Sequence, residues 1–331
     1  MSKHIYLAVL VALVLSLATT GSVFAQDSED VIVQVSWVAA PTWAGFYTAQ
    51  DEGYYTDNGM NVEVRTVFDD EGNSLDPVEE VVSGNAQFGS VSSQALLEAR
   101  LDGVPVVAIA AIYQINPTGF SSLAGQNIRV PQELIGKTVS TSESSRFLLE
   151  AMLLTVGVDP VDVNIVPRTD FTLNPLINGE IDVLSTFVMN SEASLFLQGV
   201  EFNTIYPFEY GIDMYSNLII TSEEMIENNP ELVQSFLEAT LHGIQSAVDD
   251  PEKAGIGVAA RDESLDRNEQ IEGMFRSVPL LIPAGSRPGM MEPEIWQIGY
   301  DILRNQEILV GEVDLESAYT MEFLDAIYPD E

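Results

Sequence analysis

The sequence contains no cysteine, and only two of its 331 residues are histidine, His4 and His242. A disulfide, a thiolate nucleophile and an iron–sulfur cluster are therefore excluded, and a zinc site nearly so. A Ser-His-Asp triad would have to use His242, and no G-x-S-x-G motif accompanies it. There is also no phosphate-binding loop, and no G-x-G-x-x-G follows the first expected strand. These absences favour binding over catalysis, and we expect no enzyme activity, no cofactor and no metal.

Basic residues are scarce as well. Thirteen lysines and arginines are set against 51 aspartates and glutamates, which gives a formal net charge of −38. A chain this acidic should bind neither nucleic acid nor anionic lipid surfaces. Solubility in a salty or extracellular medium accounts for the charge without a ligand. The acidic segment 69–73 superficially resembles a calcium loop, but it lacks the D-x-D-x-D-G spacing and the closing glutamate.

The longest apolar run lies at the N-terminus, where residues 5–17 follow Lys3 and lead through small residues to Ala25. This pattern is typical of a secretory signal, and we expect residues 1–25 to be removed. The run is short for a membrane span, and no second span follows. Without a cysteine near the cleavage site, no lipid can be attached there. The mature protein is therefore expected to be soluble and secreted, acting in a periplasm or outside the cell.

What the sequence does contain is a clear strand–loop–helix pattern in residues 31–55. Residues 31–38 alternate with period two in a β-branched run, which predicts the first strand. A proline–threonine pair breaks the strand, and aromatic residues at helical spacing follow. Trp37 would then lie at the carboxyl end of the strand and Trp43 at the start of the helix. Ligands bind at that edge of open α/β sheets, although both indoles could instead belong to the core.

The rest of the chain predicts a two-lobed α/β protein, because 331 residues exceed what one core usually holds. Strands and helices alternate up to an apolar strand at residues 104–113. Turn-rich segments at 114–119 and 207–212 then mark two crossings, which would form a hinge. We expect residues 26–116 to form lobe 1, residues 117–210 to form lobe 2, and residues 211–331 to complete lobe 1 with a mostly helical segment.

A series of short motifs carries a resemblance to a known family. They are WAGFYTAQ at 43–50, EGYY at 52–55, GMNV at 59–62, AQFG at 86–89, GKTV at 136–139, YGI at 210–212 with Tyr215, NPELV at 229–233, and DP at 250–251 with Ala254. In this order they resemble the bacterial solute-binding proteins related to the thiamine-pyrimidine synthases and to the sulfonate and nitrate receptors. The resemblance implies a type II periplasmic-binding fold with mixed sheets. It also implies a monomer that delivers a small solute to the membrane permease of an ABC importer.

The resemblance does not identify the solute. The residues near the expected strand ends and crossings indicate which class of ligand the protein binds. Flat aromatic walls suit a flat heteroaromatic ligand, because stacking adds about 0.5–1.5 kcal/mol beyond area burial. Hydroxyls at helix starts can bond a ligand or only cap the helix, and polar residues after the strand at 181–187 can bind ring nitrogens or form an ordinary loop. The predicted ligand-binding residues are Trp37, Trp43, Ser90, Ser92, Tyr113, Ser142, Phe187, Asn190, Glu192 and Tyr210.

Three ligand classes follow from this set. Relatives with aromatic pockets resemble receptors for the formylated aminopyrimidine of thiamine salvage, which we expect first, or for riboflavin, which is the alternative. Sulfonate and nitrate receptors use hydrogen-bond donors and few large aromatics, so they fit less well. The synthases of this group carry a reactive histidine and a cysteine-rich motif. This chain has no cysteine, and its expected cleft has no histidine nearby, so an enzyme is disfavoured.

Overall fold

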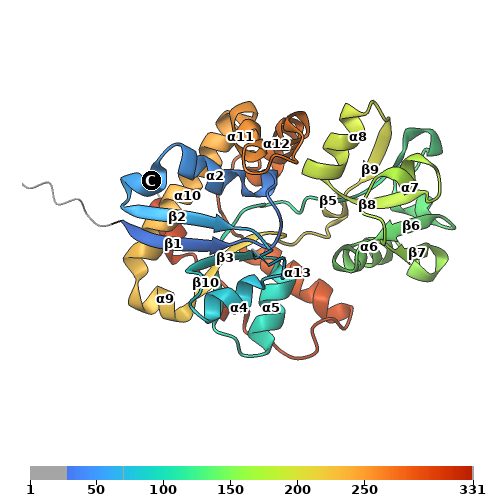
Figure 1. Ribbon diagram of the computed structural model, residues 1–331. Helices are drawn as coiled ribbons and strands as arrows, with labels where there is room; N and C mark the ends of the chain where they lie inside the picture. The colour runs from blue at the N-terminus through green and yellow to red at the C-terminus, as the bar shows by residue number, and fades with distance from the viewer. Residues whose placement is uncertain (1–27, 70, 330–331) are drawn as a thin grey trace, which may run out of the picture.

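Two five-stranded sheets form two lobes, each with helices packed on its faces (Figure 1). The computed structural model describes residues 28–69 and 71–329, so the expected signal segment lies outside the described residues. The predicted α/β architecture with mixed sheets is confirmed. Within the described ranges, no helix combines the length and the apolar character that crossing a membrane requires.

The sheet of lobe 1 consists of β1 (Glu29–Gln34), β2 (Met60–Arg65), β3 (Phe88–Val91), β4 (Val106–Ala111) and β10 (Leu218–Ser222). Its strand order is β2-β1-β3-β10-β4. β1 is parallel to β2 and β3, whereas β10 is antiparallel to both β3 and β4. The returning chain therefore places its strand inside the sheet, between two strands that were formed before the chain left.

The sheet of lobe 2 consists of β5 (Thr118–Leu123), β6 (Thr138–Thr141), β7 (Asn164–Pro167), β8 (Val183–Phe187) and β9 (Phe202–Ile205). Its strand order is β7-β6-β8-β5-β9. β6 is parallel to β7 and β8, and β5 is antiparallel to β8 and β9. Each lobe thus has one antiparallel strand inserted among parallel ones.

Helices from both ends of the chain surround lobe 1, and two of them cross in backbone contact. A Cβ at Gly243 would overlap the Gly45 carbonyl oxygen and lie 2.8 Å from Ala49 Cβ, so α10 can approach α2 only with glycine there. The elements outside lobe 2 are η1 (Pro41–Trp43), α2 (Ala44–Asp51), α3 (Tyr54–Asp57), α4 (Pro77–Val82), α5 (Ser93–Leu101), α9 (Glu223–Asn228), α10 (Pro230–Asp249), α11 (Pro251–Ala259), α12 (Arg267–Leu281), α13 (Pro293–Asn305), η7 (Leu315–Ser317) and α14 (Glu322–Ile327).

Lobe 2 carries shorter helical elements. One of them, η5, is a π-helical turn that directly follows β8, and such turns are frequent at functional sites. The elements are η2 (Ala124–Gln126), η3 (Pro131–Leu134), α6 (Glu143–Thr155), η4 (Pro160–Asp162), α7 (Asn174–Ile177), η5 (Val188–Glu192), α8 (Ala193–Leu197) and, in the returning segment, η6 (Pro207–Tyr210).

The chain passes between the sheets twice, through residues 112–117 and residues 206–217. The two crossings are bonded to each other: Asn116 Nδ2 donates to the Met214 carbonyl at 2.9 Å, and the Ile112 N–H donates to the Asn217 carbonyl at 2.8 Å. They therefore run side by side and form one paired connection.

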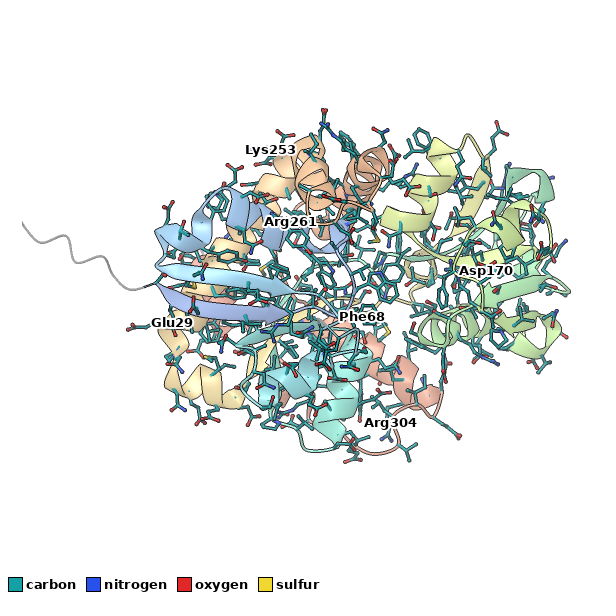
Figure 2. All side chains as sticks on the ribbon, viewed as in Figure 1. Glu29, Phe68, Asp170, Lys253, Arg261 and Arg304 are labelled. Carbon is teal, nitrogen blue, oxygen red and sulfur yellow. The ribbon has the colours of Figure 1, made fainter. Side chains whose placement is uncertain are left out.

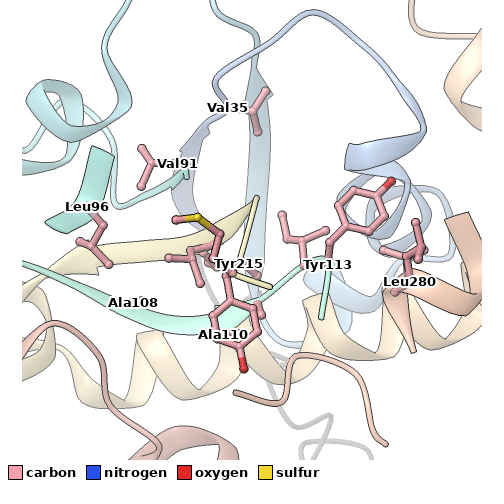
Figure 3. Close-up of a cluster of buried hydrophobic side chains, with 14 of the residues drawn as sticks. Val35, Val91, Leu96, Ala108, Ala110, Tyr113, Tyr215 and Leu280 are labelled. Atoms are coloured by element: carbon pink, nitrogen blue, oxygen red, sulfur yellow. The ribbon is translucent and has the colours of Figure 1, made fainter. Parts of the chain in front are cut away.

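A hydrophobic cluster supports the crossings on the lobe 1 side. Figure 3 shows Tyr113 and Tyr215, one from each crossing, pointing to opposite sides of this cluster. The Tyr113 hydroxyl lies 3.1 Å from Ser277 Oγ of α12, and the Tyr215 hydroxyl accepts the Glu292 N–H at 2.6 Å, just before α13. The C-terminal helices are thus fastened to the hinge region.

Ion pairs near the surface add little to this framework. Lys253 and Arg261, at and just after α11 (Figure 2), pair with Glu52 at 2.5 Å and Asp51 at 2.6 Å, respectively. Solvent-exposed pairs of this kind contribute about 0–1 kcal/mol each. The fold is therefore held mainly by its apolar cores.

The structure differs from the predicted elements at three places. β1 ends at Gln34, so the predicted strand of residues 31–38 continues as a loop. β5 was not predicted, because its sequence TGFSSL is too polar to be identified by alternation. Its hydroxyls are nevertheless satisfied inside the protein, as when Ser121 Oγ bonds Thr186 Oγ1 at 2.9 Å. β10 rejoins lobe 1 as predicted, but it makes the sheet mixed where the first four strands alone predicted a parallel one.

Candidate functional site

The carboxyl ends of the parallel strands in both lobes meet at the crossings. β4 ends at Ala111 and leads into the first crossing, and β1, β2 and β3 run in the same direction as β4. Thr118, the first residue of β5, pairs with Phe187, the last of β8, so β8 also ends there. Ligands of open α/β sheets bind at this edge. We call it the inter-lobe edge; it consists of residues 34–40, 90–93, 141–145 and 187–192 together with the two crossings.

Trp37 is the largest exposed side chain of the inter-lobe edge. It is 55% exposed and lies in the loop after β1. Two hydrogen bonds fix the backbone of this loop: the Val67 N–H donates to the Trp37 carbonyl at 3.4 Å, and Trp43 Nε1–H donates to the Val38 carbonyl at 3.1 Å. These bonds hold the backbone that carries the indole, and the exposed ring offers a flat apolar surface to a ligand.

Trp43 and Tyr113 are both buried. Trp43 is 1% exposed and stacks on Phe46 with 6.4 Å between ring centroids. Tyr113 is fully buried, and its burial raises the pKa of the phenol to about 12, although hydrogen bonds to Ser277 and Thr42 act in the opposite direction. Both rings pack in the core, which for Trp43 is the alternative that the sequence left open. Their contact with a ligand stays a prediction.

The three predicted serines lie at the inter-lobe edge with different bonding. Ser92 Oγ accepts the Ala95 N–H at 3.1 Å and so caps α5. Ser142 immediately precedes α6, and its Oγ lies 3.1 Å from Ser144 Oγ. Ser90 Oγ is buried and has no hydrogen-bond partner among the described residues. A buried group left unbonded costs about 1–3 kcal/mol, so the Ser90 hydroxyl has unused bonding capacity at a position where a ligand is expected.

The predicted ligand-binding residues in and next to η5 differ in their exposure to solvent. Asn190 is exposed and Phe187, just before the turn, is partly buried. Glu192 is 2% exposed; it accepts hydrogen bonds from the Tyr206 hydroxyl at 2.9 and 3.0 Å and lies 3.5 Å from Arg276 Nη1. Burial raises the pKa of Glu192, while bonds from Tyr206 and the charge of Arg276 act against this. The carboxylate of Glu192 is thus engaged with protein groups. Its contact with a ligand stays a prediction.

Tyr210 closes η6 in the second crossing and is partly buried. η6 packs against α6 of lobe 2. Burial raises the pKa of Tyr210, as do the nearby negative charges of Glu209 and Glu133. Tyr210 therefore belongs to the inter-lobe edge by position, beside the helix that follows Ser142.

Four further polar residues at this edge were not singled out from the sequence. The Asn116 N–H donates to Asp213 Oδ1 at 3.3 Å, which joins the crossings. Burial raises the pKa of Asp213 to about 6, against the effect of backbone N–H bonds from Asn116 and Met214. Gln34 Oε1 and Asn217 Oδ1 are buried without a partner in the described part of the chain. In the sequence, the only feature that could have pointed to any of these residues is a polar side chain within an apolar strand, as with Gln34.

The groups at the inter-lobe edge can stack on a ligand and hydrogen-bond to it, whereas His242 lies elsewhere. His242 is exposed on α10 and stacks on Tyr54 at 3.9 Å between ring centroids. Tyr54 begins α3, the short helix before the amino end of β2, so this histidine lies at the opposite end of lobe 1 from the inter-lobe edge. Among residues 28–69 and 71–329, no cluster of three or more histidine, aspartate or glutamate side chains is placed to hold a metal ion.

Two lobes with this strand order, joined by two crossings, define the periplasmic-binding-protein fold. The periplasmic aliphatic sulphonate binding protein SsuA from Escherichia coli has the same fold, with a TM-score of 0.67 and 14% identity. That similarity covers 87% of this chain and 91% of SsuA. At such low identity the likeness establishes the fold alone.

The chain belongs to the NMT1/THI5-like family, whose model matches residues 40–254. It is 26% identical over 306 residues to the riboflavin-binding protein RibY of Chloroflexus aurantiacus, covering 89% of this chain and 86% of RibY. It is also 26% identical over 231 residues to a formylaminopyrimidine-binding protein of Halalkalibacterium halodurans, covering 68% of each chain. Proteins named 4-amino-5-hydroxymethyl-2-methylpyrimidine phosphate synthase are similar to it as well. The family resemblance drawn from the motifs is confirmed.

Proposed function

We propose that this protein is the extracytoplasmic substrate-binding component of an ABC importer and that it captures a small heteroaromatic vitamin or vitamin precursor between its lobes. The observation that carries the proposal is Trp37, an indole 55% exposed at the inter-lobe edge of a binding-protein fold. The same inter-lobe edge carries the unbonded hydroxyl of Ser90 and the exposed Asn190. Binding would close the lobes about the two crossings, because both lobes contribute contacts.

The formylated aminopyrimidine of thiamine salvage is the proposed ligand, and riboflavin is the second candidate. Both are flat and carry ring nitrogens and hydrogen-bonding substituents, which suits one stacking wall with polar groups around it. Riboflavin is favoured by one specific observation: the similarity to RibY extends over 89% of the chain. An aliphatic sulfonate has no flat face for Trp37. Histidine-based synthase chemistry is disfavoured because His242 lies at the far end of lobe 1.

The Trp37→Ala variant tests the proposal. It is expected to weaken binding of the true ligand by about 1–3 kcal/mol, which is roughly tenfold or more, from lost stacking and lost apolar burial. Its stability should change little because more than half of the side chain is already in water. Calorimetric titration with formylaminopyrimidine and with riboflavin, beside thermal melts, measures both quantities.

Leu154→Ala is the matched control, since Leu154 is 58% exposed but lies near the carboxyl end of α6, at the other end of the helix from Ser142. It should leave affinity unchanged. If Trp37→Ala binds as tightly as the wild type while melting at a much lower temperature, Trp37 is a structural residue and the proposed ligand wall is wrong.

A further inference from the structure

Helix α12 belongs to the returning segment of the chain, yet it contacts both lobes and the first crossing. Figure 1 shows it between α11 and α8, and it packs against η1 of lobe 1 and against η5 and α8 of lobe 2. The Gln114 N–H of the first crossing donates to the Leu280 carbonyl at 2.9 Å, and Ser277 Oγ bonds the Tyr113 hydroxyl. α12 is therefore a third physical connection between the lobes, beside the two crossings.

At Gly273 the helix passes between the lobes without room for a side chain. A Cβ there would overlap the Met189 carbonyl oxygen of η5 and lie 2.9 Å from Pro41 Cγ of η1. Because the helix backbone itself contacts both lobes at this level, any movement of η5 away from lobe 1 must break this contact. Gly273 marks the point at which α12 joins the lobes.

About one helical turn further on, Arg276 contacts lobe 2 from outside. Its Nη1 lies 3.5 Å from Glu192 Oε2, and its Nη2 lies 2.9 Å from Glu272 Oε1 on α12 itself. Its guanidinium carbon lies 5.1 Å from the ring centroid of Phe196 on α8 and 5.9 Å from that of Phe202 on β9. A single side chain of α12 thus holds η5, α8 and β9 of lobe 2.

Glu192, the carboxylate that Arg276 meets, ends the π-helical turn whose exposed residue is Asn190. The Tyr206 hydroxyl, from the second crossing, holds the same carboxylate at 2.9 Å. Removing one partner of a buried ion pair leaves the other charge uncompensated, which is costly, so the pair fixes the end of η5. Fixing that end also fixes the exposed part of the turn that faces the inter-lobe edge.

We propose that Arg276 is a positioning residue: through Glu192 it holds Phe187–Asn190, the lobe 2 wall of the site, at a set distance from lobe 1, and α12 thereby limits how far the lobes separate. That this wall binds ligand rests on the proposed function, whereas the limit on lobe separation does not. Arg276 acts from outside lobe 2, and ligand contact stays with Asn190 and Phe187.

The absence of cysteine makes a direct test possible, because two introduced cysteines are the only labelling sites. Spin labels at D57C, exposed on α3, and V161C, 85% exposed in lobe 2, report the distance between the lobes by double electron–electron resonance. In the ligand-free protein, R276Q is expected to lengthen or broaden this distance distribution. G273A should do the same by forcing α12 away from Met189. R267Q, an exposed arginine on the same helix, is the control and should leave the distribution unchanged.

Ligand affinity supplies the second readout, with formylaminopyrimidine and riboflavin as probes. R276Q should weaken binding of whichever probe the wild type binds by about two- to thirtyfold, and R276K, which keeps the charge, should restore part of the loss. In an E192Q background, R276Q should add little. If R276Q fails to fold, R276K can be measured in its place. Lysine keeps the positive charge of Arg276 but lacks the several hydrogen-bond donors of the guanidinium group.

The proposed function and the positioning role of Arg276 can be disproved independently of each other. If R276Q changes the distance distribution while the wild type binds neither probe, the proposed function is wrong and the role of α12 in lobe separation stands. If the wild type binds a probe but R276Q matches R267Q in both distance and affinity, the positioning role of Arg276 is overturned and the proposed function stands.

Discussion

Replacing Trp43 with alanine is expected to lower the free energy of unfolding by about 3–5 kcal/mol, the usual cost of truncating a fully buried aromatic side chain. Trp43 is 1% exposed and stacks on Phe46, so the surrounding core would be left with a cavity. Urea unfolding followed by circular dichroism measures the loss. A variant within about 1 kcal/mol of the wild type would contradict the core assignment and return Trp43 to the ligand site.

Trp43→Phe separates the packing role of the ring from its hydrogen bond. The ring is largely retained, but the N–H that donates to the Val38 carbonyl at 3.1 Å is lost. The expected loss of stability is about 0.5–1.5 kcal/mol, much less than for alanine. Because the same bond fixes the loop that carries Trp37, ligand affinity should fall more in this variant than its small loss of stability would suggest.

Replacing Asp213 with asparagine is expected to stabilise the protein at pH 7.5 by about 2–3 kcal/mol and to have little effect at pH 4. Burial raises the pKa of Asp213 from 3.8 to about 6. Between these values the folded protein binds more protons than the unfolded chain, so this group lowers stability as the pH rises through that window. An asparagine carries no charge to bury, and its Oδ1 can still accept the Asn116 N–H.

Urea unfolding of both proteins at pH 4 and pH 7.5 measures this difference, since all other carboxyls contribute equally to the two proteins and cancel. Asp57→Asn, on the exposed helix α3, is the control for the removal of one negative charge. An equal effect of Asp213→Asn at both pH values would show that the Asp213 carboxyl is not protonated in the folded protein near pH 5.

The architecture could be predicted because its signals are local. Alternating β-branched runs, proline at helix starts and glycine at helix ends set the order of most strands and helices, and the asparagine–proline pair at 229–230 marked α10. The pairing of β10 with β3 and β4 could not be predicted, since it joins segments over 100 residues apart. Because β10 is apolar throughout, its sequence is compatible with either parallel or antiparallel pairing in a buried sheet.

The site was harder to predict, because the direction in which a side chain points matters more than its position along the sequence. Trp37 and Trp43 are six residues apart in one motif, yet one is open to solvent and the other buried, since β1 ends at Gln34 and the chain turns into η1. Glu192 was assigned to the ligand because it follows a strand, but the π-helical turn directs it inward to Tyr206 and Arg276. Its partners come from elements that are distant in sequence, and no local pattern indicates them.

We expect the two lobes to enclose a flat heteroaromatic molecule. The most direct test incubates the purified protein with equal amounts of formylaminopyrimidine, riboflavin and taurine, an aliphatic sulfonate, then desalts it, denatures it and identifies the released molecules by mass spectrometry. The wild-type protein should release the pyrimidine or riboflavin in near-stoichiometric amount, and the Trp37→Ala variant should release much less of it. Release of taurine alone, or of none of the three, would show that the lobes do not enclose a flat heteroaromatic molecule.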